Sequence, residues 1–283
     1  MDLHIIDTGY FKLDGGAMYG VVPKQMWKRL NAPDENNMCT WAMRCLLVKD
    51  GDRLILVDTG MGNKQDAKFR SHFQPHGEAS LLSSISKAGY SAEDITDVFL
   101  THFHFDHVGG AVCFDANENL VPTFPNAAYW TNKSHFDWAA TPNFREKASF
   151  LKENFLPLME NGVLKFLDEQ DGTHFSENIT VDYFYGHTES LMVPTFHLPN
   201  GKKVVFTADL LPSAGHVRMP YVMSYDIRPL ETLKDKGRFY EKALDDNTFI
   251  FFEHDKDNAF GQLIKDERGR YGIETKTIND IWE

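Results

Sequence analysis

The amino-acid sequence predicts an α/β protein folded as a single domain, residues 1–283. Stretches with strand-like patterns alternate with stretches of helical spacing, which is the arrangement typical of α/β proteins. No low-complexity segment, long charge run or Pro/Gly-rich linker divides the chain. Its 283 residues, 42% of them hydrophobic and 13% aromatic, suffice to bury a full core.

In the first half of the chain, the pattern predicts a hairpin, a helix and a third strand. Residues 41–48 and 53–58 are apolar strands joined by the polar turn 49–52. Leu81, Leu82 and Ile85 have helical spacing, and Gly89 stands where such a helix would end. The strand predicted over residues 97–100 runs directly into a cluster of histidines.

In the second half, helices and strands again alternate. The apolar spacing predicts helices over residues 144–159 and 230–244. Four further strands are expected, over residues 179–185, 192–198, 203–208 and 248–252.

Composition excludes several classes of protein. Three cysteines without a C-x-x-C pair favour reduced thiols and a cytoplasmic location, and the first residues do not have the pattern of an export signal. No apolar run approaches the length of a membrane span. The net charge of −12 disfavours nucleic acid as a partner, because phosphate binding depends on basic surface.

The chemistry is carried by the run His102-Phe103-His104-Phe105-Asp106-His107. In an extended backbone, residues two apart project to the same side, so His102 and His104 could bind one ion. Asp106 and His107 lie just beyond and could turn toward a second ion. Imidazole nitrogen and carboxylate oxygen are ligands that zinc and similar ions prefer. The run therefore predicts a metal site rather than a histidine-rich surface loop.

Two ions need more ligands than this run supplies, and three candidates follow predicted strands. His187 comes after the strand 179–185, Asp209 after 203–208 and His254 after 248–252. Functional groups of α/β folds gather at the carboxyl ends of strands. We therefore expect these three side chains to complete the metal site.

Taken together, these motifs resemble the five ordered motifs of the metallo-β-lactamase superfamily. The matching segments are Asp58-Thr59-Gly60, the run from His102 to His107, Gly186-His187-Thr188, Asp209 and His254. The resemblance implies a four-layer αββα sandwich with a two-metal site at the edge of two sheets. It also implies the ligand sets: His102, His104 and His187 for one ion; Asp106, His107 and His254 for the other; Asp209 bridging both. Asp58 would orient ligand loops without binding metal.

The charges of such a site fit hydrolysis. Two divalent ions bring a charge of +4 and two aspartates bring −2. The net charge of +2 favours a metal-bound hydroxide and an electron-rich substrate oxygen. The hydroxide would be the nucleophile, and Asp106 or Asp209 could move the proton. Zn²⁺ is the expected metal, with Fe, Mn or Co as alternatives.

The stretch from Leu13 to Lys24 resembles the N-terminal segment of a subgroup of this superfamily, the quorum-quenching N-acyl-homoserine-lactone lactonases. That resemblance implies a lactone substrate, a possible homodimer, and Met18, Tyr19 and Val22 as contacts of the acyl chain; ordinary core or dimer packing is the alternative for these three. Two positions depart from the subgroup. Glu189 follows the Gly-His-Thr motif closely, where a small residue is common, and Pro212 replaces a tyrosine that binds the lactone carbonyl. His216, Tyr221 and Tyr225 are candidates to take over that role.

Other functions compete with lactone hydrolysis. A thioester hydrolase of the glyoxalase II type and a phosphodiester hydrolase use the same ligands, although the acidic charge disfavours the second. A redox protein that holds iron in this site and a non-catalytic metal-binding protein are further alternatives. Neither a G-x-S-x-G elbow, a P-loop nor a dinucleotide fingerprint is present.

Overall fold

The computed structural model describes residues 1–283, which divide into two compact units. The first unit comprises Met1–Gly9 and Met43–Thr173, and the second comprises Tyr10–Ala42 and His174–Glu283. The chain passes from one unit to the other within two long strands, β1 and β2, and again at the start of β9.

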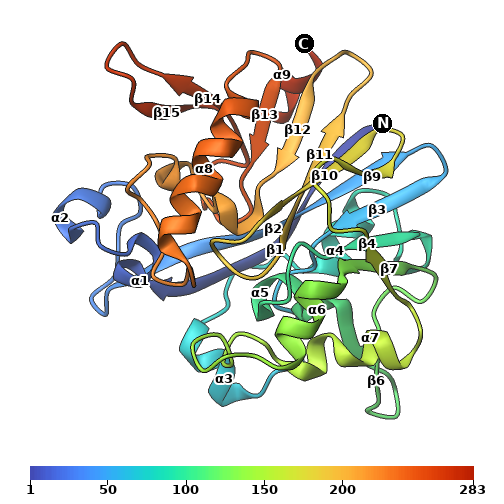
Figure 1. The fold of residues 1–283 in the computed structure, drawn as a ribbon. Helices are drawn as coiled ribbons and strands as arrows, with labels where there is room; N and C mark the ends of the chain where they lie inside the picture. Colours follow the sequence, from blue (N-terminus) through green and yellow to red (C-terminus); the bar gives the residue numbers. More distant parts are fainter. The chain divides into compact units, whose positions relative to one another are not determined.

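A six-stranded sheet is the framework of the first unit (Figure 1). Its strands, in spatial order, are β1 (Asp2–Asp14), β2 (Met38–Asp50), β3 (Arg53–Val57), β4 (Asp97–Phe99), β7 (Ala128–Asn132) and β8 (Leu164–Leu167). The hairpin predicted from the sequence is confirmed, because β2 and β3 pair antiparallel with Asp50 opposite Arg53. Strands β3, β4, β7 and β8 are parallel, so residues 58 and 100–102 leave the sheet at the same edge.

Short helices connect the strands of the first unit. They are α3 (Ala67–Phe73), α4 (Leu81–Lys87), α5 (Phe105–Val108), α6 (Lys133–Ala140) and α7 (Leu156–Glu160), with the 3₁₀ turns η1 (Ala92–Asp94), η2 (Gly109–Ala111) and η3 (Lys152–Asn154). A small ribbon of β5 (Val112–Phe114) and β6 (Leu120–Pro122) follows the histidine run. The predicted helix α4 is confirmed: Leu81 and Ile85 are buried in the core, and Gly89 adopts φ 92° after its end.

The continuous helix predicted over residues 144–159 is wrong. Hydrogen-bonded turns occupy the first part of this segment, where the Asn143 side chain accepts hydrogen bonds from the backbone N–H groups of Arg145 and Glu146. Asparagine competes with the helix in this way because its short side chain reaches the neighbouring backbone. Pro157 then stands in the first turn of α7, a position it favours, so the chain starts a new helix there.

The second unit is built on a seven-stranded sheet. Its strands, in spatial order, are β15 (Tyr271–Lys276), β14 (Phe260–Lys265), β13 (Thr248–Phe251), β12 (Lys203–Phe206), β11 (Leu191–His197), β10 (Ile179–Phe184) and β9 (Thr173–Ser176). The four strands predicted for this part of the chain are β10 to β13. Strands β12 and β13 are parallel, so the residues that follow them emerge at one edge of the sheet.

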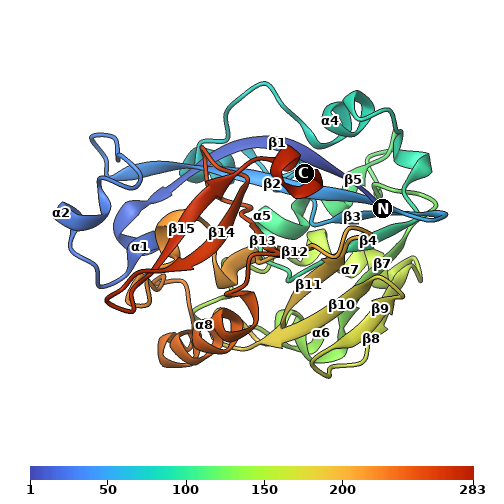
Figure 2. The ribbon, with the colours of Figure 1, turned by 90° about the horizontal axis from the view of Figure 1, so that it is seen from above.

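Helices of the second unit are α1 (Gly15–Tyr19), α2 (Lys24–Trp27), α8 (Pro229–Ala243) and α9 (Ile278–Trp282), with 3₁₀ turns η4 (Ala208–Leu210) and η5 (Ala214–His216). The predicted helix 230–244 is α8, which lies alongside the sheet (Figures 1 and 2). It is fixed to β10 by an ion pair between Lys242 and Asp182 at 2.8 Å. The Asp235 carboxylate also accepts the backbone N–H groups of Tyr185 and Gly186 just beyond that strand.

The mixed α/β architecture expected from the sequence is thus confirmed in both units. No helix of the structure combines the length and the hydropathy that crossing a lipid bilayer requires.

Candidate metal centre

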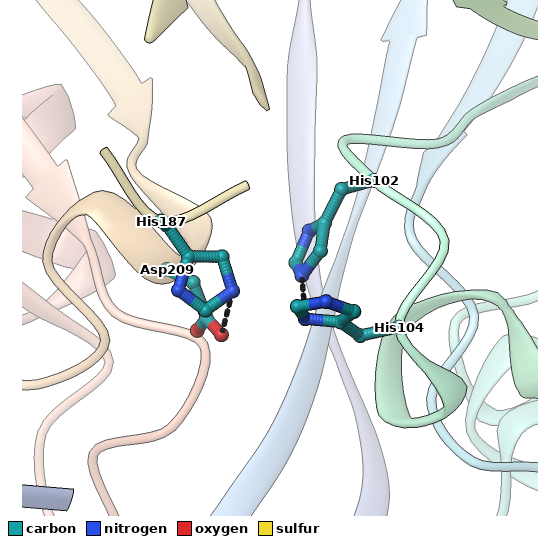
Figure 3. A group of neighbouring side chains, drawn as sticks. All are labelled: His102, His104, His187 and Asp209. Atoms are coloured by element: carbon teal, nitrogen blue, oxygen red, sulfur yellow. Dashed lines mark hydrogen bonds and ion pairs between the residues drawn. The ribbon is translucent and has the colours of Figure 1, made fainter. Parts of the chain in front are cut away.

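The histidine run of the first unit leaves β4 at the edge of the sheet and enters α5. His102, His104, Asp106 and His107 are all buried. His102 and His104 turn to the same side, as their two-residue spacing predicts, and Nε2 of His102 lies 3.1 Å from Nδ1 of His104 (Figure 3). The ring of His107 packs against His102 with 4.0 Å between the centroids.

Asp58 ties this run to the end of β3. Its carboxylate accepts hydrogen bonds from the Thr101 backbone N–H at 2.8 Å, the Thr101 hydroxyl at 2.6 Å and Nδ1 of His107 at 3.0 Å. Asp58 adopts φ 57°, a left-handed conformation that is uncommon for a residue with a side chain. Strained backbone of this kind concentrates at functional sites because the surroundings must enforce it.

These contacts determine which nitrogen each imidazole keeps for a ligand. Because the Thr101 hydroxyl donates to Asp58, its oxygen can accept the Nδ1–H of His102 at 3.1 Å, which leaves Nε2 of His102 as a lone pair. The Asp58 contact likewise leaves Nε2 of His107 as a lone pair. An outer hydrogen bond that fixes the tautomer in this way is typical of metal-binding histidines.

In the second unit, Asp209 is the centre of the corresponding group. It lies in η4, after β12, and its two carboxylate oxygens face different imidazoles. Oδ2 is 3.0 Å from Nε2 of His187, and Oδ1 is 3.2 Å from Nε2 of His254 (the His187 contact is drawn in Figure 3). The carboxylate thus offers one oxygen to each of two histidines.

The two histidines of this group also have outer partners. Nδ1 of His187 donates to Asp226 at 2.9 Å, and Nδ1 of His254 donates to the Ala42 carbonyl at 2.8 Å. Burial lowers the pKa of His187, but the Asp209 and Asp226 carboxylates outweigh it and raise that pKa to about 10. The two carboxylates therefore favour a positive charge at this imidazole.

The donor set fits a zinc-like ion. Two imidazole lone pairs that face each other repel unless a proton or a cation lies between them. Two nitrogens bound at about 2.0–2.1 Å in tetrahedral geometry would lie about 3.3 Å apart, close to the 3.1 Å that separates His102 and His104. The donors are imidazole nitrogens and carboxylate oxygens, which suit zinc and other borderline divalent ions.

The residues expected to contact an acyl chain belong to one buried cluster of the second unit. Tyr19 is stacked between Trp27, at 5.4 Å, and His216, at 4.7 Å, and Tyr221 meets it edge-on at 6.2 Å. Met18 is buried beside them, and its carbonyl accepts a hydrogen bond from Nε2 of His216. Val22, also buried, closes the turn after α1. Their contact with a substrate stays a prediction.

His216 is held in its neutral form within this cluster. Burial lowers its pKa to about 3, more than the hydrogen bond to Met18 raises it. Nε2–H donates to Met18, so Nδ1 accepts the hydroxyl of Ser213 at 2.7 Å. A proton on Nδ1 would disrupt the second of these bonds.

Acidification should therefore destabilise the protein through His216. Its folded pKa lies below its ordinary value of 6.5, so the unfolded chain binds the proton first as the pH falls. Stability from this group is fully present above pH 6.5 and declines toward pH 3, with a slope of up to about 1.4 kcal/mol per pH unit. Urea unfolding of wild type and His216→Asn between pH 7 and 4 should show the steeper decline in wild type. Parallel declines would contradict a neutral His216.

A single lysine holds the segment that follows His216. Lys236 of α8 is buried, and its ammonium faces four backbone carbonyls of residues 216–221. The distances are 2.7 Å to His216, 2.9 Å to Arg218, 3.4 Å to Met219 and 3.2 Å to Tyr221. The Tyr240 hydroxyl, also on α8, donates to the Val217 carbonyl.

Sequence reasoning missed two acidic residues that contact the candidate ligands. Asp226 lies 39 residues beyond His187, and Glu146 lies in the turns after α6, beside His104. Neither belongs to a motif, so only the fold could reveal them. Pro212, which departs from the lactonase pattern, uses its carbonyl to accept the backbone N–H of His254.

Comparisons with known proteins agree with this geometry. The model of the family described as "Metallo-beta-lactamase superfamily" matches residues 44–254. A probable metallo-hydrolase of Mycobacterium tuberculosis is 36% identical over an alignment of 112 residues that covers 35% of this chain and 36% of that protein. The chain thus spans about a third of the length of the first curated relatives.

Solved structures share the fold over nearly the whole chain. A probable metal-dependent hydrolase from Staphylococcus aureus has a TM-score of 0.86 and 23% identity, covering 98% of both chains. AidC, a dizinc quorum-quenching lactonase in complex with a product, has a TM-score of 0.79 and 24% identity, covering 98% of this chain and 94% of that one. The fold class predicted from the sequence is confirmed.

Proposed function

Because the chain belongs to the metallo-β-lactamase superfamily, we propose that it is a metal-dependent hydrolase of a small ester, such as an N-acyl-homoserine lactone. The observation that carries this proposal is Asp209, which offers one oxygen to His187 and the other to His254. That arrangement is the one a carboxylate needs in order to bridge two ions.

We propose that seven side chains form one two-metal centre within a single domain, residues 1–283. One ion would be held by His102, His104 and His187, the other by Asp106, His107 and His254, with Asp209 bridging. Asp58 would orient His107 and the Thr101 loop. The outer hydrogen bonds of four histidines support this proposal, because they leave a lone pair on Nε2 that can bind a metal ion. These histidines are His102, His107, His187 and His254. We propose Zn²⁺ as the metal, with Fe, Mn or Co as alternatives.

When bound, two such ions polarise a carbonyl and lower the pKa of water to about 7. The protein's own residues then have two tasks. Asp209 and Asp106 are buried carboxylates that can accept the proton released when water attacks, and pass it to the leaving alkoxide. The aromatic cluster around Tyr19 and His216 would border the acyl chain.

A lactone is proposed over other esters because AidC, a lactonase, matches nearly the entire chain, including the N-terminal stretch. Pro212 cannot hydrogen-bond a lactone carbonyl through its side chain. Tyr221 or Tyr225 would assume that role, because both ring nitrogens of His216 are already hydrogen-bonded. The partner is then a small molecule and neither nucleic acid nor a membrane. We further propose a cytoplasmic homodimer.

Metal analysis and a substrate panel test this proposal. Protein purified without chelators should contain two zinc-like ions per chain. In a pH-drop assay it should open N-hexanoyl-homoserine lactone faster than it cleaves a thioester or a bis-phosphate ester. Inert lactones, together with phosphodiester or thioester cleavage, would overturn the lactonase assignment. A content of one iron ion per chain, together with no hydrolysis of any substrate in the panel, would overturn the assignment as a hydrolase.

A further inference from the structure

Glu146 is a buried carboxylate outside the superfamily motifs. Its side chain is 3% exposed. Two donors hold one of its oxygens: Nε1 of Trp138 lies 2.7 Å from Oε2, and Nδ2 of Asn143 lies 2.6 Å from the same atom. A buried carboxylate is costly unless donors of this kind compensate it.

The other oxygen of Glu146 faces a candidate metal ligand. Oε1 lies 3.5 Å from Nε2 of His104, whose ring also packs against Phe150 at 4.9 Å. The opposite ring nitrogen, Nδ1, is the one turned toward His102. Glu146 and the ligand direction therefore lie on opposite sides of the same imidazole.

We infer that Glu146 is a positioning residue for His104: by accepting Nε2–H it keeps Nδ1 unprotonated and directed at the metal ion. This inference rests on the proposed function, since it assumes that His104 binds metal. His104 thereby gains an outer acceptor that selects the tautomer, as the other four histidines have, although its contact of 3.5 Å is longer than their 2.8–3.1 Å. A purely structural role would need only Oε2, the oxygen that joins Trp138 to Asn143.

Glutamine at this position should reverse the tautomer. Trp138 and Asn143 both donate, so the amide oxygen must stay in the Oε2 position, and the NH₂ group is then presented to His104. His104 would accept that donor on Nε2 and carry its proton on Nδ1, the nitrogen that should bind metal. Glu146→Gln therefore conserves size but inverts the hydrogen bond.

The experiment compares Glu146→Gln with Glu160→Gln, which makes the same change at an exposed position of the first unit. Zinc affinity is measured by competition with a chromophoric chelator. The expected result is about 10- to 100-fold weaker binding of one of two ions in Glu146→Gln and no change in the control. Glu146→Asp, which retains an acceptor, should lie between them and serves if the glutamine variant does not fold.

A second measurement does not depend on metal. NMR of ¹⁵N-histidine-labelled, metal-free protein reports which nitrogen of His104 is protonated. We expect Nε2 of His104 to carry a proton in wild type and to lack it in Glu146→Gln, where the proton of this ring lies on Nδ1. If wild type binds no metal, the proposed function fails while this tautomer test still decides the role of Glu146. Unchanged affinity together with an unchanged tautomer would overturn the inference.

Discussion

Asp209→Asn is expected to lower kcat/KM for N-hexanoyl-homoserine lactone by about 10²- to 10⁴-fold. The substitution keeps the shape of the side chain but removes its charge and replaces one oxygen with an NH₂ group. That group cannot bind a metal ion. Only one of the two atoms that lie 3.0 Å from His187 and 3.2 Å from His254 would therefore remain a possible metal ligand. The loss combines weaker metal bridging with the loss of a proton acceptor.

The matched control is Asp246→Asn, which makes the same chemical change at an exposed position of the second unit. Initial rates of lactone opening and metal content, measured on the same samples, separate the two causes. Retention of both ions with full activity in Asp209→Asn would contradict a bridging and catalytic role. Loss of one ion with loss of activity agrees with it.

Gly109→Ala should cause a large loss of stability without touching any ligand. An added Cβ would lie 2.0 Å from the Met61 carbonyl oxygen and 2.4 Å from its carbon, and both atoms belong to the backbone. The loop after β3 would have to move away from α5, although the Thr59 backbone N–H donates to the His107 carbonyl at 2.7 Å. We expect destabilisation at or above the upper end of the range of about 1–3 kcal/mol for overpacking.

Gly237→Ala is the control for this substitution. Gly237 lies within α8, and an added Cβ would meet nothing within 4 Å. Alanine in a helix interior should stabilise the protein by about 0.5–1 kcal/mol. Urea unfolding of both variants in the presence of zinc gives the two free energies. A Gly109→Ala variant as stable as wild type would show that the loop is not packed as described.

The sequence reveals seven of the fifteen strands, those whose apolar runs are bounded by turn residues, because such runs are local signals. It also reveals the candidate ligands, since histidine and aspartate at strand ends form a recognisable pattern. The prediction of a helix over residues 144–159 was wrong although the apolar spacing is helical. The Asn143 side chain binds the backbone of the following residues, and Pro157 starts a separate helix. Asp226 and Glu146 could not be predicted, because their partners are distant in sequence and meet them only through tertiary packing.

Lys236 determines which residues of the segment 216–221 can be substituted. Its ammonium contacts only backbone carbonyls of residues 216–221, so the anchor does not depend on which side chains that segment carries. Residues 218–220, which are not buried, can therefore be exchanged while the path of the chain is kept. The segment combines a fixed backbone with replaceable side chains, much as an antibody loop does.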